Sequence, residues 1–314
     1  MAKRSRTKSR DAQTAAPAGE VGPRQPCPCG SGRRYKACHG AAGGAPAVFV
    51  NRPFEGMPSE CDVVALRELV PAATAPLTVK DSDRTVKLCS LLPMAAPAMV
   101  RESGEVWLGL QVQHNFGDPA RDLGAVLTRA LEQAEAGELG IVGLTDPPGE
   151  GPRLQDLVTD ASLDITVHDG FDYWIADLED QSGMAAALEQ ANASASPTTR
   201  LASVEAAYWT DVGTKEHLRW VMPEPEDKLL DALARLHAAG RDSVAEGSRF
   251  VGMFRAHGLL APVWDLPLGT GAEVLEDPAA RFAADLEEAM KGGDLTAAER
   301  SARAGLANRQ VTIR

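Results

Sequence analysis

The sequence predicts an α+β protein, in which a folded body follows an N-terminal segment with no core of its own. Three observations support this prediction. Apolar residues in helical spacing alternate along the chain with short runs rich in β-branched residues. The chain has 314 residues, of which 44% are hydrophobic, and this is enough for a body with a real core. The stretch up to about Pro46 is instead rich in Ala, Pro, Gly and Ser, so it cannot build a core by burial alone.

Charge divides the chain at nearly the same place. Residues 1–40 hold nine Lys and Arg against two Asp and Glu, a net charge of +7, and the remainder holds 23 against 42, a net charge of −19. A basic segment of this kind is typical of proteins that meet a polyanion, and we expect the ribosome or another RNA as the partner of the basic N-terminus.

Residues 27–40 read CPCGSGRRYKACHG and contain three of the five cysteines. A tetrahedral zinc site takes four nitrogen or sulfur ligands. The segment offers that set in Cys27, Cys29, Cys38 and His39. Gly30 and Gly32 allow a tight turn between them, and the cations that follow offset the charge of three thiolates. We expect one Zn²⁺ per chain, with iron as the alternative metal.

This segment resembles the SEC-C motif, a small zinc-binding module found at the C-terminus of the preprotein translocase ATPase SecA and on many other bacterial proteins. The resemblance implies the same four ligands and permits docking to a protein of the secretion or translation machinery. We expect Arg33, Arg34, Tyr35 and Lys36 to contact the partner. The resemblance covers about fourteen residues, and the chain has no P-loop of the form G-x-x-x-x-G-K-[ST], so it implies no ATPase. The whole arrangement is similar to an uncharacterised actinobacterial family of SEC-C-containing proteins.

These features predict the domain organisation. We expect a basic disordered tail at 1–24, the zinc module at 25–40, a Gly/Ala/Pro linker at 41–47 and an α+β body at 48–314.

The body begins with a helix in the segment 58–69, where apolar residues have helical spacing. Strands are expected at 77–80, 84–92, 97–102 and 105–113, the last two joined as a hairpin by ESGE. A helix then begins at Pro119 with Asp118 as its N-cap and ends at Gly137.

This order of elements is expected to repeat. Residues 66–82 align without gaps to 154–170, and 126–137 align to 229–240, with an extra helix near 181–195 in the second copy. We interpret the body as two duplicated α-β-β-β-β-α units at 58–140 and 150–240.

A C-terminal helical part, 241–314, is expected to complete the core. Val244, Phe250, Val251 and Phe254 predict one helix, and APVWDLPLGTG predicts a broken crossing segment. Asp277 and Pro278 open another helix, and Thr296 with Glu299 forms a capping box for the last one.

Catalytic patterns are not found in the body. His168 and Asp169 are neighbours in an expected strand, so they point to opposite faces. The other body histidines stand alone in the sequence, and Cys61 and Cys89 are expected to be buried structural thiols. The glycine-rich GTG at 269–271 lacks the strand and helix that a phosphate-binding loop needs.

The sequence therefore predicts a zinc-binding adaptor of the bacterial cytoplasm, in which the zinc module and basic tail dock a partner. The alternative is an enzyme of unknown reaction, with its site in the groove between the two repeat units. No stretch of the sequence is long and apolar enough to span a membrane.

Overall fold

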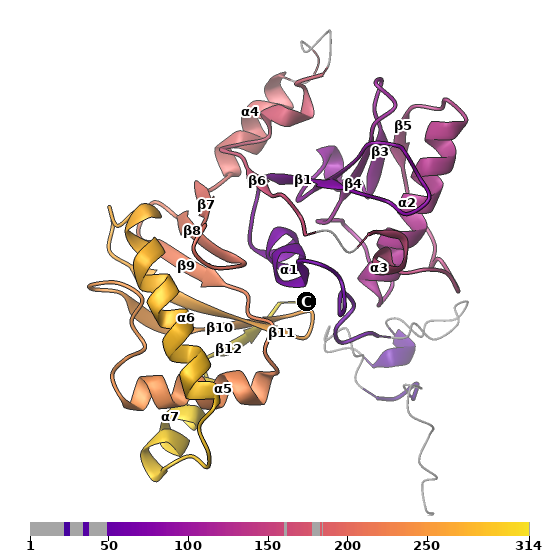
Figure 1. Cartoon of the computed structure of the whole chain (residues 1–314). Helices are drawn as coiled ribbons and strands as arrows, with labels where there is room; N and C mark the ends of the chain where they lie inside the picture. Colours follow the sequence, from indigo (N-terminus) through magenta and orange to yellow (C-terminus); the bar gives the residue numbers. More distant parts are fainter. Residues whose placement is uncertain are drawn as a thin grey trace, which may run out of the picture. The chain divides into compact units, whose positions relative to one another are not determined.

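The structure is a computed structural model that describes residues 22–25, 34–37, 49–159, 162–177, 183 and 185–313. Contacts between residues divide the chain into two compact units, Met1–Phe49 and Val50–Arg314. The second unit, which we call the body, contains two six-stranded sheets and seven α-helices within the described residues (Figure 1).

The first sheet comes from the first half of the body, in the strand order β5-β3-β4-β2-β1-β6. Its strands are β1 (Ala73–Leu77), β2 (Val86–Cys89), β3 (Ala98–Val100), β4 (Val106–Gly109), β5 (Gly140–Val142) and β6 (Thr166–Val167). Neighbours run antiparallel except β2 and β4, which are parallel. Two short helices accompany them, η2 (Pro93–Ala95) and α3 (Leu154–Leu157).

Helix α2 (Pro119–Glu135) covers one face of this sheet. Its start is as predicted, because the Asp118 side chain accepts a hydrogen bond from the backbone N–H of Arg121 and Pro119 follows directly. Leu123, Val126 and Leu127 on its apolar side are buried in the core shared with Val106 and Leu108 of β4, so the amphipathic pattern of α2 determines which face it covers.

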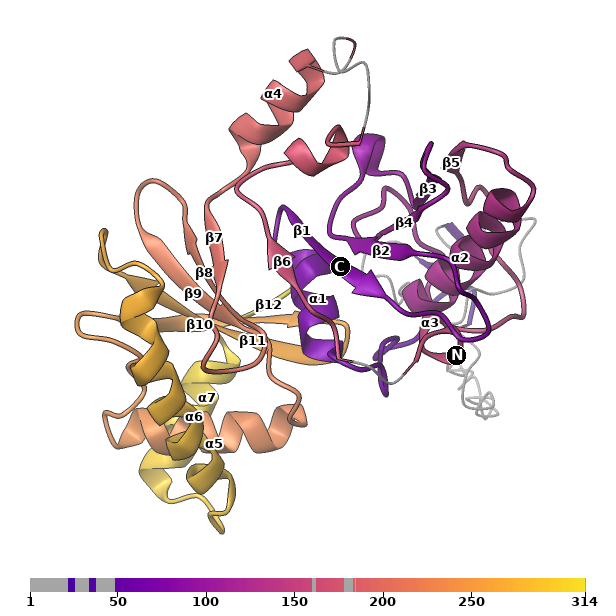
Figure 2. The same cartoon turned by 45° about the horizontal axis from the view of Figure 1, so that its top comes forward.

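The opposite face is covered by the segment after β6, which contains η3 (Asp172–Trp174) and α4 (Ala185–Ser194). Trp107 alternates with Val106 and Leu108 along β4 and therefore points to this face, where it packs with Phe171 and Trp174. Arg101 holds the segment in place by donating to the carbonyl of Trp174 at 2.8 Å and to the carboxylate of Asp177. Leu188 of α4 is buried in the same cluster, and the far end of α4 projects beyond the sheets (Figures 1 and 2).

The second sheet comes from the second half of the body, in the strand order β12-β10-β11-β9-β8-β7. Its strands are β7 (Thr198–Arg200), β8 (Ala207–Asp211), β9 (Glu216–Trp220), β10 (Arg249–Ala256), β11 (Leu259–Leu266) and β12 (Gln310–Thr312). The helices that accompany it are α5 (Glu226–Ala238), η4 (Glu273–Leu275), α6 (Glu276–Met290) and α7 (Ala297–Ala307). Trp220, Trp264 and Phe282 form an aromatic centre between this sheet and α6, with ring centroids 5.2–6.5 Å apart.

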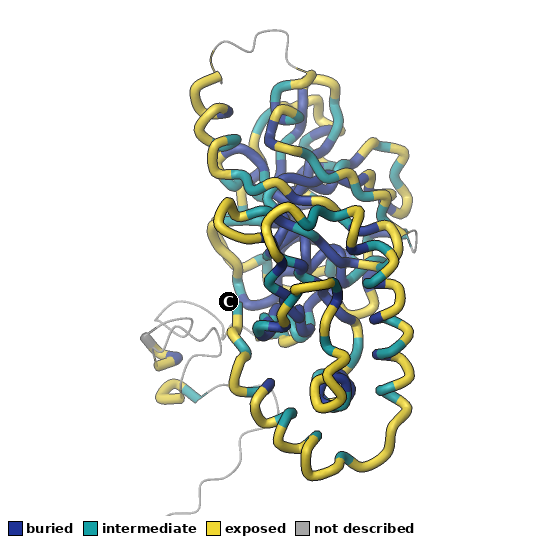
Figure 3. Tube along the Cα trace, turned by 90° about the vertical axis from the view of Figure 1, so that its left-hand side faces the viewer, coloured by how far each residue is buried: buried dark blue, intermediate teal, exposed yellow. Residues whose placement is uncertain are grey.

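Helix α1 (Glu60–Glu68) lies between the two sheets, as both ribbon views show (Figures 1 and 2). Its residues Val63, Val64 and Leu66 are fully buried in a single core that also includes Tyr208 of β8 and Leu259 of β11. Buried residues gather along the middle of the body, and exposed residues lie on the outer helices and loops (Figure 3). The two sheets therefore share one core through α1.

The helix predicted from Val244, Phe250 and Phe254 is wrong, and so is the broken crossing segment after it. Residues 249–266 form the antiparallel hairpin β10–β11 instead, with His257 and Gly258 in the left-handed backbone region at its turn. Nearly every residue of β11 is buried, because α1 and the C-terminal helices cover its two faces. A strand buried on both faces has no alternation of apolar and polar residues, so its sequence does not distinguish it from a helix.

The predicted duplication also needs correction. In 60–137, β1 to β4 belong to one sheet and include a parallel pair, whereas in 150–240 β6 belongs to the first sheet and β7, β8 and β9 form an antiparallel meander in the second. The two segments therefore do not superpose as similar units. The aligned stretches 66–82 and 154–170 instead lie side by side, because β1 pairs with β6.

The α+β class is confirmed, with strands and helices mixed along the body. The helix near 181–195 is present as α4, and the predicted capping box of Thr296 and Glu299 opens α7. The first strand lies at 73–77 instead of 77–80. Among the described residues, no helix combines the length and apolar character needed to cross a bilayer.

Asp62 of α1 provides a test of how strongly the two sheets are coupled. Its carboxylate is 4% exposed and accepts from Tyr208 Oη at 2.6 Å and from Arg200 Nε and Nη2 at 3.0 and 2.9 Å. Asp62→Ala leaves both donors without an acceptor, and we expect the free energy of unfolding to fall by about 2–4 kcal/mol in urea denaturation.

Glu287→Ala is the matched control, because Glu287 has a similar 2.8 Å ion pair with Lys291 on the exposed face of α6. We expect no measurable change there. An equal loss of unfolding free energy in the two variants would contradict the conclusion that the buried Asp62 carboxylate links α1 to the second sheet.

Candidate functional site

The predicted metal ligands lie in the first unit. Cys27, Cys29, Cys38 and His39, together with Arg33, fall outside the described residues. Their chemistry can still be compared with what a metal needs. Three thiols and one imidazole form a donor set of the kind that structural zinc sites use, with no further ligand required.

The structure describes the two stretches that flank these ligands, 22–25 and 34–37. The first is a turn with Pro23 at its second position, in which Gln25 N–H donates to the carbonyl of Gly22 at 2.9 Å. The second contains the short helix η1 (Tyr35–Ala37). The two stretches are joined by backbone hydrogen bonds, from Tyr35 N–H to Gln25 O at 2.8 Å and from Lys36 N–H to Pro23 O at 3.0 Å.

The residues predicted to contact a partner differ in exposure. Arg34 and Lys36 are exposed, so their cationic groups can reach a partner, whereas Tyr35 between them is only 4% exposed. This alternation gives the two cations and the ring different environments within three consecutive residues.

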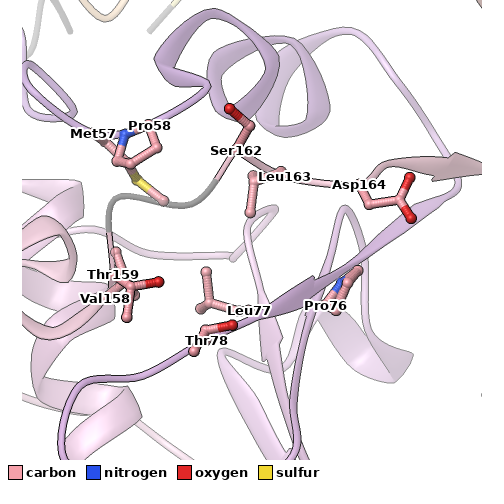
Figure 4. Close-up of a pocket in the computed structure, with 10 residues that line it drawn as sticks. All are labelled: Met57, Pro58, Pro76, Leu77, Thr78, Val158, Thr159, Ser162, Leu163 and Asp164. Atoms are coloured by element: carbon pink, nitrogen blue, oxygen red, sulfur yellow. The ribbon is translucent and has the colours of Figure 1, made fainter.

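In the body, α1 occupies the space in which the sequence placed a groove between two repeat units. A pocket of about 90 Å³ lies elsewhere, between β1 and residues 158–159 and 162–164 (Figure 4). The side chains of Met57, Leu77 and Leu163 point toward it, and the carboxylate of Asp164 lies at its margin (Figure 4). The polar side-chain groups of its lining are three hydroxyls and the carboxylate of Asp164, and no hydrogen bond among the described residues joins that carboxylate to a hydroxyl of the lining.

Pro76 lines this pocket and interrupts the backbone hydrogen bonds beside it. On the side facing β6, His168 N–H donates to Ala72 O and, farther along, Thr159 N–H donates to Thr78 O. Alternate residues of a strand face the same neighbour, so Pro76 also turns its backbone toward this side. Because proline has no N–H to donate, the ladder opens at Pro76.

His168 lies at the end of β6, on the aromatic face of the first sheet. Its Nε2 is 2.8 Å from Thr74 Oγ1, and its ring lies 4.9 Å from that of Tyr173. Burial, with the nearby charge of Lys87, lowers the pKa of His168. Asp169 is exposed and forms no hydrogen bond with His168, so the two do not form the base and orienting carboxylate of a triad.

Trp107 lies on the same face, between two cations. Lys87 Nζ and Arg101 Cζ are 4.6 and 4.3 Å from the centroid of its ring. Its Nε1–H donates to Glu105 at 2.6 Å, and Glu105 also pairs with Lys87. The polar groups of this cluster are therefore satisfied by one another, as in a structural network.

Three body histidines that stand alone in the sequence pair with carboxylates in the fold. His217 Nδ1 lies 3.0 Å from Asp265, His237 Nδ1 lies 2.6 Å from Asp242, and His257 Nε2 lies 2.7 Å from Glu68. Two of these pairs join residues 48 and 189 positions apart, so no local pattern in the sequence predicts them.

The glycine-rich GTG at 269–271 does bind an anion, but the anion belongs to the chain. Glu216 accepts from the backbone N–H groups of Gly269 and Gly271 at 2.5 and 2.9 Å, and from Trp209 Nε1 at 2.6 Å. Burial alone would raise the pKa of Glu216, but these hydrogen bonds hold it below its ordinary value. The N–H groups of Gly269 and Gly271 are therefore already occupied by a carboxylate of the same chain.

In the parts of the chain that the structure describes, no three His, Cys, Asp or Glu side chains come together as metal ligands. Cys61 and Cys89 are free and buried. Burial raises the pKa of each thiol to about 12, and for Cys61 the charges of Glu60 and Asp62 add to the effect. The expectation that both are structural thiols agrees with this environment.

Thiol alkylation separates the two groups of cysteines. At pH 8 a thiol of pKa near 12 is ionised to about one part in ten thousand, so iodoacetamide should leave Cys61 and Cys89 unmodified in the folded protein. Peptide mass spectrometry after chelation should find label on Cys27, Cys29 and Cys38 alone. Rapid labelling of Cys61 in the native state would show that this thiol is accessible and reactive.

The comparisons with known proteins match the N-terminal segment and the body separately. The profile of a family of unknown function (DUF5926) matches residues 53–314, and that of the SEC-C motif matches residues 24–41. A 30-residue stretch is 67% identical to the protein translocase subunit SecA of Aromatoleum aromaticum, which covers 9% of this chain and 3% of that protein. The chain thus spans a very small part of that relative. No solved structure matches.

Proposed function

The chain belongs to the family of unknown function DUF5926 and carries a SEC-C motif, and from this combination we propose that it is a zinc-binding adaptor of the bacterial cytoplasm. In this proposal Cys27, Cys29, Cys38 and His39 hold one Zn²⁺, which orders a segment too poor in apolar residues to fold by burial. The ordered module and the basic tail then dock a partner, and the body provides a second surface.

The charge distribution carries the proposal. A segment of net charge +7 is joined to a body of net charge −19, and Arg34 and Lys36 of the module are exposed. At physiological ionic strength the screening length is about 8 Å, so attraction between the two parts of the chain through solvent is weak. A ribosomal RNA surface presents a dense phosphate array, so it competes well for the basic segment.

A protein partner is the other outcome that the SEC-C motif permits. The matched relative is a subunit of a protein translocase, and the shared stretch is 30 residues long. The body chemistry described above gives no comparable support to an enzyme, since the polar groups of its clusters are paired with one another.

Metal content tests the ligand set. Elemental analysis after gel filtration should find about one Zn²⁺ per chain, and Cys29→Ser should lose it because three ligands no longer close a tetrahedral site. Cys61→Ser and Cys89→Ser are matched controls and should keep the metal, because these thiols lie in the body. Full zinc in Cys29→Ser would contradict the assignment, and iron in place of zinc would change the metal but keep the ligands.

Salt dependence tests the partner. The relevant cations are Lys3, Arg4, Arg6, Lys8, Arg10, Arg33, Arg34 and Lys36. If most of them meet phosphates, affinity for ribosomes should fall by about 10³- to 10⁵-fold between 50 and 200 mM salt, as expected for six to ten contacts. Replacing the eight by Gln should abolish co-sedimentation.

The control for this experiment replaces exposed cations of the body, Lys228, Arg281 and Lys291, and should sediment with ribosomes like the parent. If the parent fails to sediment with ribosomes at 50 mM salt, the RNA partner is wrong. Docking to a protein is then the form of the proposal that remains to be tested.

A further inference from the structure

The turn Gly22–Gln25 lies at the very start of the metal-binding segment. The SEC-C match begins at residue 24, so Gly22 and Pro23 precede it. Gln25 nevertheless makes three hydrogen bonds there. Its N–H donates to Gly22 O at 2.9 Å, its side-chain Oε1 accepts from Gly22 N–H at 2.9 Å, and its carbonyl accepts from Tyr35 N–H at 2.8 Å.

The bond between Tyr35 N–H and Gln25 O joins two points of the chain that are ten residues apart. Gln25 is two residues before Cys27, and Tyr35 is three residues before Cys38. A further backbone hydrogen bond, from Lys36 N–H to Pro23 O at 3.0 Å, joins the same two stretches. In the sequence, Cys27 and Cys29 follow the first of these hydrogen-bonded points, and Cys38 and His39 follow the second.

We infer that Gln25 is a positioning residue for the metal. Through its bond with Tyr35, it keeps the stretch that leads to Cys27 and Cys29 beside the stretch that leads to Cys38 and His39. This inference rests on the proposed zinc site. Binding a metal between two distant stretches requires the chain to close on itself, and closure lowers the conformational entropy of the segment. When a turn already joins the two stretches before the metal binds, less of the free energy of metal binding is used to close the chain.

The side-chain amide is the part of Gln25 that can be tested. Its Oε1 closes the turn by satisfying Gly22 N–H, and this in turn fixes the carbonyl that receives Tyr35 N–H. Methionine has nearly the shape of glutamine but offers no comparable acceptor, whereas glutamate keeps an acceptor oxygen at the same position. The pair Gln25→Met and Gln25→Glu therefore separates the hydrogen bond from the bulk of the side chain.

The experiment measures the zinc affinity of the full chain by competition with a colorimetric chelator. We expect Gln25→Met to bind Zn²⁺ about three- to ten-fold more weakly, the size of effect of one lost hydrogen bond, and Gln25→Glu to stay within about two-fold of the parent. Gln13→Met, in the basic tail outside the turn, is the matched control and should bind like the parent.

A spectroscopic readout separates positioning from ligation. With Co²⁺ in place of Zn²⁺, the thiolate-to-cobalt absorption at saturation should be the same in Gln25→Met and the parent, because the ligands are unchanged, and weaker in Cys29→Ser. The thermal unfolding of the body should not change in any of these variants.

The outcomes distinguish the two ideas. Parental zinc affinity in Gln25→Met, or equal weakening in Gln25→Glu, overturns the role of Gln25 while Cys29→Ser still loses the metal. Zinc retained in Cys29→Ser overturns the metal site itself and with it the proposed function.

Discussion

The body depends on the burial of charged side chains on a short helix. Helix α1 has nine residues and lies between two sheets, so Asp62 and Arg67 are buried and Glu68 is mostly buried, and their charges must be paired within the protein. Asp62 is met by Arg200 and Tyr208, Arg67 by the carbonyl of Leu110, and Glu68 by His257. Because these partners come from both halves of the body, the pairing of one helix fixes how the two sheets are joined.

The electrostatics of Glu68 show how this works. Burial alone would raise the pKa of Glu68, but the hydrogen bond with His257 and the charge of Arg67 bring it below its ordinary value. The ring of His257 also packs edge-on against Phe54, and Gly258 beside it leaves no room for a side chain next to Asn51 and Arg52. The tip of the β10–β11 hairpin is thus tied to the stretch that precedes α1 as well as to α1 itself.

A shared core has a consequence for function. The space between the sheets is filled by a helix, and the polar clusters around Trp107 and Glu216 are satisfied internally. The first unit differs, because its sequence supplies a donor set of three thiols and an imidazole, and Arg34 and Lys36 of the same segment are exposed. The proposed docking function accordingly relies on the charge and the donor set of the N-terminal segment.

The sequence by itself determined the α+β class, the division into a basic segment and an acidic body, the cap of α2 at Asp118, the capping box of α7 and the SEC-C motif with its donor set. Each of these depends on residues a few positions apart, so local spacing is enough to predict it. Only the tertiary structure decided that α1 is central, that 249–266 is a hairpin and not a helix, that β1 pairs with the stretch that resembles it, and that Gln25 meets Tyr35. These features come from burial on two faces or from backbone atoms that every residue shares, and neither leaves a periodic pattern in the chain.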